Sequence, residues 1–420
     1  MTNNEAWKKL FAELHILAHL DADGRFELAA HQIKALTGKE PRNMSKWDSR
    51  DARPDVLKKA DVTILPTSRH GYTLVRGDGY CSIPPAGPAH YHSPARLQSY
   101  TTLPWKEELT KESAAIDVAA ISQMLQKFTG DPELALTIRG RSGTPAFAFR
   151  FHGKDRVHRL EIDRAQIEVD AGFEGGKIWL LEAKLGEPAD FLVRQLYYPW
   201  RLWRDITKKE VVPVFLSYVN KTFGLFRYAF DEADDYHSVR LCEHGWFTLD
   251  EPSQVRSMAD LYLEAKPVAR LPGDIPFPQA DTLGTVITAV ELFAHEATRA
   301  ADIAAVMSFD ERQGIYYSAA ARWLGYIDRA LDLLPEGARF VHASRWERFE
   351  LLFRAVAATP VFREAIRAKL DSRPLWEDEI TELIERGGYA TRSTARRRSK
   401  TVASWLDWLW REHANLTSSM

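Results

Sequence analysis

The sequence predicts an α/β protein in which a mixed sheet flanked by helices lies between an N-terminal α+β unit and a helical C-terminal region. Three observations predict this class. Residues 113–230 alternate helical apolar spacing with short apolar runs of strand length, which is typical of a sheet covered by helices. Beyond the Pro/Gly-rich segment 271–279, apolar residues recur almost wholly at helical spacing. A chain of 420 residues is also longer than one hydrophobic core usually accommodates.

We expect three domains, at residues 1–100, 101–270 and 280–420. The first opens with apolar residues at helical spacing and continues through a basic polar stretch at 34–55. A short strand and a glycine-rich hairpin follow within 61–80. These patterns predict a small α+β unit ahead of the central sheet.

The central domain is expected to run helix, strands, helix, strands. Its helices are expected at 113–128 and 190–206, where apolar residues recur at helical spacing. We expect the strand 134–141 to pair with the strand 145–151. Further strands are expected at 165–170, 177–185, 211–219 and 223–230.

Composition excludes several classes of protein. The formal net charge is −2, so a case for nucleic-acid binding must rest on local basic clusters. The only cysteines, Cys81 and Cys242, supply neither a zinc site nor a disulfide framework, which favours a reducing compartment. The N-terminus lacks the pattern of a signal peptide, and no apolar run reaches membrane-spanning length. We therefore expect a cytoplasmic protein without a membrane partner.

The chemically informative stretch is the pair of strands within residues 166–185. Side chains alternate faces along a strand, so Glu182 and Lys184 are expected on one face and Ala183 on the other. A charged pair at the end of an apolar run is costly to bury unless other groups pair with it. Asp170 precedes the predicted turn and can meet that pair across the hairpin. The turn itself is expected at the glycines Gly172, Gly175 and Gly176.

Two carboxylates and a lysine at a sheet edge suit the hydrolysis of phosphodiester bonds. Mg²⁺ is usually held through only one or two protein carboxylates, which leaves room for water and phosphate. Asp170 and Glu182 are the predicted metal ligands, and Mn²⁺ is expected to substitute for Mg²⁺. The metal polarises a phosphoryl oxygen and lowers the pKa of a bound water. Lys184 is expected to orient that water or to stabilise charge in the transition state.

Asp170 is followed, after eleven residues, by Glu182-Ala183-Lys184. This pattern resembles the active-site motif of the PD-(D/E)XK nuclease superfamily. Val169 stands where the proline of the motif's name would stand, and that proline is often absent in the superfamily. The order of an upstream helix, strands around a glycine turn and a downstream helix also resembles the superfamily core. The resemblance implies a PD-(D/E)XK-like nuclease domain.

A wider resemblance connects most of the chain to bacterial type II restriction endonucleases. It is carried by KEPRNMSKWDSRDARPDVLKKADVTILPTSRHGY, LTIRGR, AQIEVDAGFE, EAKLGEPADFLVRQLYYPWRLW and TARRRSKTVASWLDWLW. The resemblance implies that Glu112 adds an acidic group from the first helix of the nuclease domain and that Gln195 supports the site from the second. It further implies a homodimer acting on double-stranded DNA. A cognate DNA methyltransferase is expected in the same system, without a stable complex.

The C-terminal region offers a candidate DNA-reading module. Helices are expected at 282–297, 301–309 and 310–327, and the last carries Arg312 and Gln313. Three helices of this length resemble a winged-helix or helix-turn-helix module. A dimerisation or scaffold bundle has the same sequence pattern and is the alternative.

A basic cluster opens the helix expected at 391–410. Ser393 or Thr394 can cap this helix, and Trp405 and Trp408 are expected to bury its later turns. Basic residues at a helix N-terminus run against the helix dipole, which favours a bound polyanion there over the alternative of a solvated turn. The predicted DNA-binding residues are Arg396, Arg397 and Arg398 here, with Arg42 and Lys46 in the N-terminal recognition unit.

The sequence thus predicts a Mg²⁺-dependent endonuclease that cuts double-stranded DNA at specific sites, as type II restriction enzymes do. Three alternatives stay open. The hairpin can be a solvated turn with a surface salt bridge. The enzyme can be a repair nuclease or one that requires modified bases. The chain can also be a DNA-binding regulator without catalysis.

Overall fold

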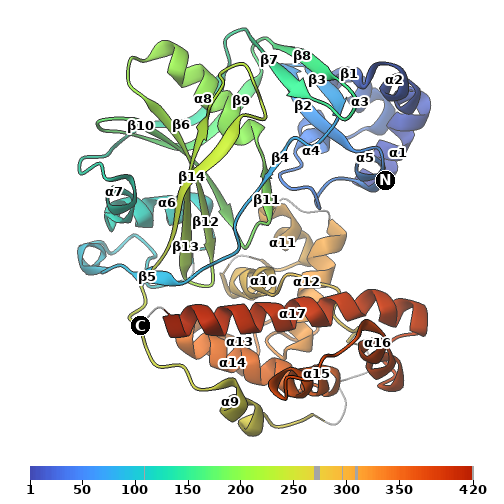
Figure 1. Cartoon of the computed structure of the whole chain (residues 1–420), viewed down its shortest axis with the longest axis vertical. Helices are drawn as coiled ribbons and strands as arrows, with labels where there is room; N and C mark the ends of the chain where they lie inside the picture. Colours follow the sequence, from blue (N-terminus) through green and yellow to red (C-terminus); the bar gives the residue numbers. More distant parts are fainter. Residues whose placement is uncertain (108, 269–274, 296, 308–310, 419–420) are drawn as a thin grey trace.

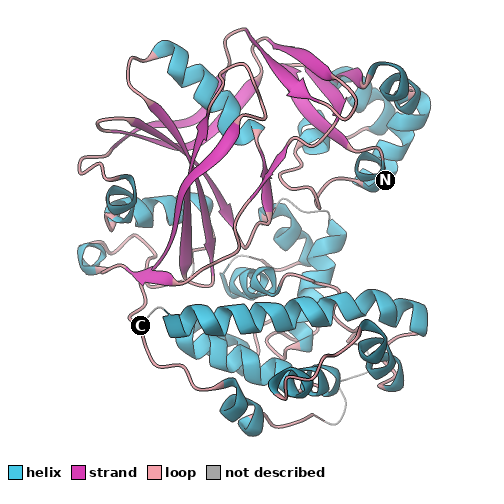
Figure 2. Ribbon diagram, in the orientation of Figure 1, coloured by secondary structure: helices cyan, strands magenta, loops and turns pink. Residues whose placement is uncertain are grey.

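Three groups of elements follow one another along the chain in the computed structural model (Figure 1). An N-terminal unit of helices and strands lies beside a larger mixed sheet, and a layer of helices lies against one end of that sheet (Figure 2). The predicted mixed sheet flanked by helices and the helical C-terminal region are confirmed. The structure describes residues 1–107, 109–268, 275–295, 297–307 and 311–418.

The N-terminal unit packs helices against a small antiparallel sheet of order β1-β3-β2. A capping box between Thr2 and Glu5 begins its first helix. Trp7 and Leu10 on that helix are fully buried, and the Trp7 indole donates a hydrogen bond to the Met44 carbonyl (3.0 Å). The elements are α1 (Asn3–Glu13), α2 (Ile16–Asp23), β1 (Arg25–Ala29), α3 (Ala30–Thr37), α4 (Pro41–Ser45), α5 (Asp55–Lys59), β2 (Val62–Ser68) and β3 (Gly71–Arg76).

The central sheet has, within the described residues, seven strands in the order β5-β14-β13-β12-β10-β9-β6. β10 is parallel to β12 and β14 is parallel to β5, while the other neighbours are antiparallel. The helix α8 makes the crossover from β10 to β12, since a parallel step needs such a connection. The strands are β5 (Ala89–Tyr91), β6 (Ala135–Gly143), β9 (Gln166–Glu174), β10 (Ile178–Leu185), β12 (Val211–Val219), β13 (Thr222–Phe230) and β14 (Val239–Thr248).

Further short elements surround this sheet. β4 pairs with β11, and β7 pairs with β8, both in antiparallel fashion. β4 pairs with β11 and β5 pairs with β14, so residues 80–91 contact strands that follow residue 100. The predicted domain boundary at residue 100 stays a prediction. The elements are β4 (Tyr80–Ser82), η1 (Ala95–Ser99), α6 (Glu112–Ile121), α7 (Met124–Thr129), β7 (Phe147–His152), β8 (Val157–Ile162), β11 (Asp190–Leu192) and α8 (Arg194–Ile206).

Both faces of β10 are covered. On one face Leu180 packs in a core with Tyr197 of α8, and on the other Leu181 packs in a core with Ile116 of α6. A strand enclosed in this way accepts a charged side chain only where partners are supplied, because an unpaired buried charge is very costly. The partners of any charge on β10 therefore have to come from neighbouring elements.

The predicted pairing of the strand 134–141 with the strand 145–151 is wrong. β6 pairs with β9, and β7 pairs with β8, a strand that the sequence pattern did not reveal. Pro145 has no N–H to continue a ladder, and the Thr144 N–H donates to the Ala165 carbonyl (2.9 Å). That bond ties the end of β6 to the start of β9.

The predicted glycine turn is shorter than expected. Gly172 lies inside β9 opposite Leu180, and the connection to β10 contains Gly175 and Gly176. A Cβ added at Gly172 would lie 2.7 Å from the Ile138 Cβ, so this glycine serves close packing between strands rather than a turn.

The C-terminal region is helical from residue 283 onward, and its described part contains no strand beyond an isolated bridge between Ile327 and Leu333. The boundary predicted at 271–279 falls partly on 269–274, outside the described residues. No described helix has both the length and the apolar character needed to span a membrane. The helices, including α9 that precedes them, are α9 (Met258–Glu264), α10 (Leu283–His295), α11 (Ala300–Val306), α12 (Glu311–Trp323), α13 (Pro335–His342), α14 (Arg345–Ala357), α15 (Pro360–Leu370), α16 (Glu377–Arg386) and α17 (Arg392–Ser418).

The long helix α17 anchors this region to the sheet. Trp405 and Trp408 are buried as predicted, and Glu187, just after β10, accepts hydrogen bonds from Trp408 Nε1 (2.7 Å) and from Arg411. The predicted caps Ser393 and Thr394 are wrong, because the helix already begins at Arg392 and these residues lie inside it. The loop after β10 is therefore held against the helical layer.

Candidate functional site

The end of β10 places two charged side chains on one face of the sheet. Side chains alternate faces along a strand, so Glu182 and Lys184 lie on the same face of β10 as Leu180. Ala183 packs in the core on the opposite face. The predicted separation of faces is confirmed. Glu182 is only 8 % exposed, so its carboxylate depends on protein partners.

Asp170 reaches this pair through an irregularity in β9. Ile167 and Val169 pack in the core beside α8, but Ala171 packs in the core beside α6, although a regular strand would keep all three on one face. The pairing with β6 is irregular at the same point, which is the signature of a β-bulge. The Asp170 carboxylate accepts a hydrogen bond from the Ala183 N–H (2.9 Å), so the bulge brings it to the end of β10.

Lys184 lies at the centre of the cluster. Its Nζ donates to Glu182 Oε1 (2.7 Å), to the Ala183 carbonyl (3.0 Å) and to Glu112 Oε1 (3.3 Å). Glu112 is the first residue of α6, so its acidic group comes from the helix that the sequence pointed to. The structure thus brings Glu112, Glu182 and Lys184 together, as the sequence predicted.

Gln195 lies in the first turn of α8 and supports Glu182. Its Nε2 donates a hydrogen bond to Glu182 Oε1, and its own Oε1 is buried with no hydrogen-bond partner among the described residues. Gln195 thus holds one oxygen of the Glu182 carboxylate in place and leaves an acceptor unused.

The electrostatics of the cluster favour an additional cation. Burial, together with the nearby carboxylates of Asp170 and Glu112, raises the pKa of Glu182 to about 8 against the opposing effect of Lys184. Burial acts to lower the pKa of Lys184, but the surrounding carboxylates hold that pKa well above its ordinary value. Burial also raises the pKa of Glu112. Lys184 therefore stays positively charged, but its single charge does not neutralise all the carboxylates around it.

The donor set fits Mg²⁺ held through few protein ligands. Among the described residues, no group of three or more His, Cys, Asp or Glu side chains is arranged to hold a metal. Asp170 and Glu182 would supply two carboxylates, and Mg²⁺ commonly keeps several waters beside one or two carboxylates. The residues present therefore fit such an ion, whose binding stays a prediction.

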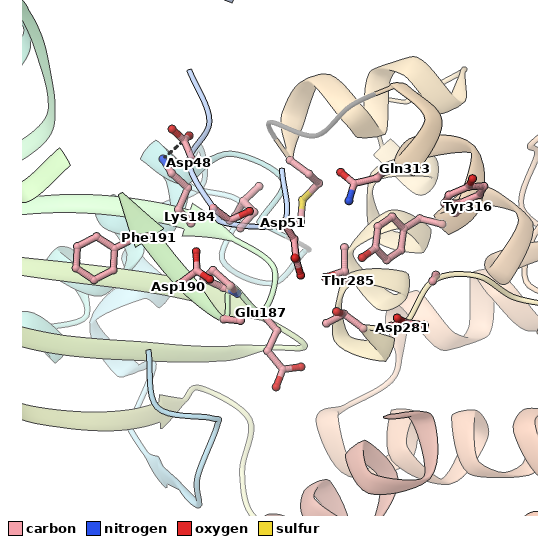
Figure 3. A pocket seen from close by; sticks show the side chains of 18 of the residues that line it. Asp48, Asp51, Lys184, Glu187, Asp190, Phe191, Asp281, Thr285, Gln313 and Tyr316 are labelled. Atoms are coloured by element: carbon pink, nitrogen blue, oxygen red, sulfur yellow. Dashed lines mark ion pairs between the residues drawn. The ribbon is translucent and has the colours of Figure 1, made fainter. Parts of the chain in front are cut away.

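Sequence reasoning missed Asp48. This residue of the N-terminal unit is 7 % exposed, and its Oδ2 lies 3.9 Å from Lys184 Nζ. Figure 3 shows Asp48 and Lys184 facing each other in the wall of a cleft of about 360 Å³. Nothing in the sequence marks Asp48, which stands in a basic polar stretch far from β9 and β10. Only the docking of the N-terminal unit brings it to the site.

Two of the predicted DNA-binding residues lie near this cluster. Lys46 Nζ is 3.9 Å from Asp48 Oδ2, and its charge lowers the pKa of Glu112 against the effect of burial. Arg42 is half-exposed and pairs with Glu168 of β9 (2.6 Å). Both residues thus lie along the edge where β9 meets the N-terminal unit.

The predicted basic residues of the C-terminal region divide into two places. Burial lowers the pKa of Arg398, and the neighbouring cations Arg397 and Arg312 lower it further, so these arginines lie together. Gln313 lines the same cleft as Lys184. Arg396 is exposed and pairs with Glu377 of α16 (3.3 Å), so it belongs to a different surface. Their role in binding DNA stays a prediction.

Comparison with known families gives three matches, each to a domain of unknown function. Residues 4–74 match DUF6996, residues 76–248 match DUF6997, and residues 285–414 match DUF7226. No curated protein and no solved structure matches the chain. These families carry no functional description, so the resemblance to restriction endonucleases stays a prediction.

The raised pKa of Glu182 predicts a pH-dependent stability. With a folded-state pKa of about 8 against an ordinary value of 4.5, the folded protein binds more protons than the unfolded chain between these values. The free energy of unfolding therefore falls as pH rises through that range. We expect Glu182→Gln to remove this part of the fall, measured by urea denaturation in EDTA. Glu168→Gln, which changes an exposed carboxylate on β9, should keep the wild-type slope. Identical slopes for wild type and Glu182→Gln would contradict the buried, crowded carboxyl.

Proposed function

We propose that this protein is a Mg²⁺-dependent endonuclease that hydrolyses phosphodiester bonds in double-stranded DNA. The observation that carries the proposal is the convergence of Asp170, Glu182 and Lys184 at the end of β10. A hairpin with a surface salt bridge would leave these groups in solvent, whereas Glu182 and Lys184 are largely buried. Maintaining such a charged cluster inside a fold is costly, which favours a functional reason for it.

The order of elements supports a PD-(D/E)XK-like core. The helix α6, the strands β6, β9 and β10, the helix α8 and the strand β12 occur in this order, with α7, β7, β8 and β11 as additional elements between them. This order resembles that of the superfamily, with an upstream helix carrying an acidic residue and a downstream helix carrying Gln195. The resemblance supports the proposed roles of Asp170, Glu182 and Lys184, which we assign from their contacts.

Each residue has a role in the proposed reaction. Asp170 and Glu182 would hold Mg²⁺, which when bound supplies polarisation of a phosphoryl oxygen and a lowered pKa of bound water. Gln195 keeps the Glu182 carboxylate in its orientation. Lys184 offers a fixed positive charge to the attacking water and to the charge that develops on the phosphate.

Basic surfaces beside the cluster are the proposed contacts with DNA. A groove of about 690 Å³ adjoins the start of β9 and includes Arg69, Arg141 and Arg164 in its lining. Its residue Gln166 precedes Asp170 by four residues on the same strand, or about 13 Å at the rise of a β-strand. Arginines at this distance suit the phosphates that flank a cleaved bond. The group formed by Arg312, Arg397 and Arg398 would add contacts from the helical region, which we propose as a winged-helix-like module.

The wider biological setting is proposed from the sequence resemblance. A type II restriction enzyme would act in the cytoplasm as a homodimer, because two sites cut two strands and a palindromic target mirrors a twofold axis. A cognate DNA methyltransferase would protect the host without forming a stable complex. Discrete fragments from plasmid DNA would support this class. Cutting only of methylated DNA would indicate a modification-dependent enzyme, and binding without cutting would indicate a regulator.

Loss of either central residue should abolish or strongly slow the cleavage of DNA without unfolding the protein. We expect Glu182→Ala to remove a metal ligand, and Lys184→Ala to slow single-turnover cleavage of plasmid DNA by on the order of 10²–10³-fold. Wild-type activity should vanish in EDTA and return with Mg²⁺ or Mn²⁺. Glu174→Ala and Lys177→Ala, at the opposite end of the β9–β10 hairpin, are the matched controls and should cut normally. Folded Glu182→Ala protein that cuts like wild type would rule out this site.

The basic residues of α17 should contribute unequally to DNA binding. We expect Arg397→Ala with Arg398→Ala to weaken the binding of duplex DNA and to reduce the slope of log affinity against log salt by about one unit for each lost phosphate contact. Arg396→Ala should have a smaller effect, because that side chain pairs with Glu377. Fluorescence anisotropy in Ca²⁺ at several salt concentrations measures both quantities. An unchanged slope in the double variant would assign these arginines to a solvated surface.

A further inference from the structure

Asp48 is a buried carboxylate without hydrogen bonds. Neither Oδ1 nor Oδ2 has a hydrogen-bond partner among the described residues, and the residue is 7 % exposed. Its closest cations are the ammonium groups of Lys46 and Lys184, each 3.9 Å from Oδ2. Burying a carboxylate in this way is unfavourable, and such a group calls for a specific explanation.

The fold holds Asp48 in this position through its neighbours. The Asp48 carbonyl accepts a hydrogen bond from the Leu192 N–H of β11 (3.1 Å). Arg50, two residues on, donates its N–H to Asp190 Oδ1 (2.8 Å) and its guanidinium to Asp78 and to the Tyr80 carbonyl. These hydrogen bonds hold the segment around Asp48 against β4 and β11 of the central unit. They would have to break before this segment could move away from the site.

Lys184 has no hydrogen left for Asp48 in this arrangement. An ammonium group has three N–H donors, and Lys184 already donates to Glu182, to the Ala183 carbonyl and to Glu112. Asp48 is a further carboxylate that faces the ammonium group, and Figure 3 shows the ion pair between the two side chains. The separation of 3.9 Å is longer than a hydrogen bond but within reach of a small rotation of the lysine.

We propose that Asp48 is the alternative acceptor for Lys184 when Glu182 takes up a divalent cation. This inference rests on the proposed function. A cation bound by Glu182 competes with the ammonium group for the same carboxylate, which releases one N–H of Lys184. Asp48 then accepts that N–H, so that Lys184 stays charged and fixed at the edge of the cleft. Asp48 is thus a positioning residue that acts through Lys184.

The proposal gives the N-terminal unit a part in the active site. Asp48 belongs to that unit, whereas Glu182 and Lys184 belong to the central sheet. The loaded site would be complete only while the segment around Asp48 is docked on β4 and β11. Displacement of that segment would therefore remove the proposed alternative acceptor of Lys184.

The binding of Mn²⁺ alone, without DNA, tests the proposal. In calorimetric titrations of the full chain, we expect Asp48→Ala to raise the dissociation constant for Mn²⁺ by about tenfold, because Lys184 then has no acceptor to move to. Asp48→Asn keeps an acceptor oxygen and should lie closer to wild type. Asp55→Ala, an exposed acid of the same unit, should bind Mn²⁺ like wild type. The melting temperature of Asp48→Ala in EDTA should not be lower than that of wild type.

Each other outcome is decisive. Equal Mn²⁺ affinities for Asp48→Asn and Asp48→Ala would overturn the acceptor role and leave only the effect of charge. Wild-type affinity in Asp48→Ala, or a lowered melting temperature with unchanged affinity, would assign Asp48 to structure alone. Wild-type protein that binds Mn²⁺ with the expected pattern but cuts no DNA would overturn the proposed function and not the role of Asp48. Absence of Mn²⁺ binding in wild type would overturn both.

Discussion

The balance of charge around Lys184 is the constraint on which the rest of the candidate site depends. Its ammonium group donates to Glu182 and Glu112, and without it these neighbouring carboxylates would repel one another. One lysine does not neutralise the group of acids that faces it. The cluster is therefore stable enough to form in the folded protein and still has an affinity for a further cation.

The fold brings this cluster together from separate parts of the chain. The bulge in β9 brings in Asp170, the crossover helix α8 brings in Gln195, and the docked N-terminal segment brings in Asp48. Each contribution has a cost, whether an interrupted strand ladder or an unsatisfied buried oxygen. Costs of this kind concentrate at functional sites, because selection for stability alone would remove them.

Local sequence patterns predicted the part of the site that lies within one hairpin. The two-residue period along β10 placed Glu182 and Lys184 on one face. The helical period predicted helices at 113–128 and 190–206, where the structure forms α6 and α7 in place of the first, and β11 followed by α8 in place of the second. The pairing of β6 with β9 was not predictable, because strands that are neighbours in sequence have similar patterns and any of them could pair. The hydrogen bond from Thr144 to Ala165, next to Pro145, becomes evident only in the folded structure. Asp48 was not predictable either, since its role depends on docking across the chain rather than on any local period.

The location of a bound metal tests the central claim most directly. Crystals of the wild-type protein with Mn²⁺ and duplex DNA would reveal the ion by its anomalous scattering. Our account predicts a peak about 2.1 Å from carboxylate oxygens of both Asp170 and Glu182, with Lys184 beside the phosphate. A Mn²⁺ ion bound elsewhere, with Asp170 and Glu182 still linked only to protein groups, would contradict it.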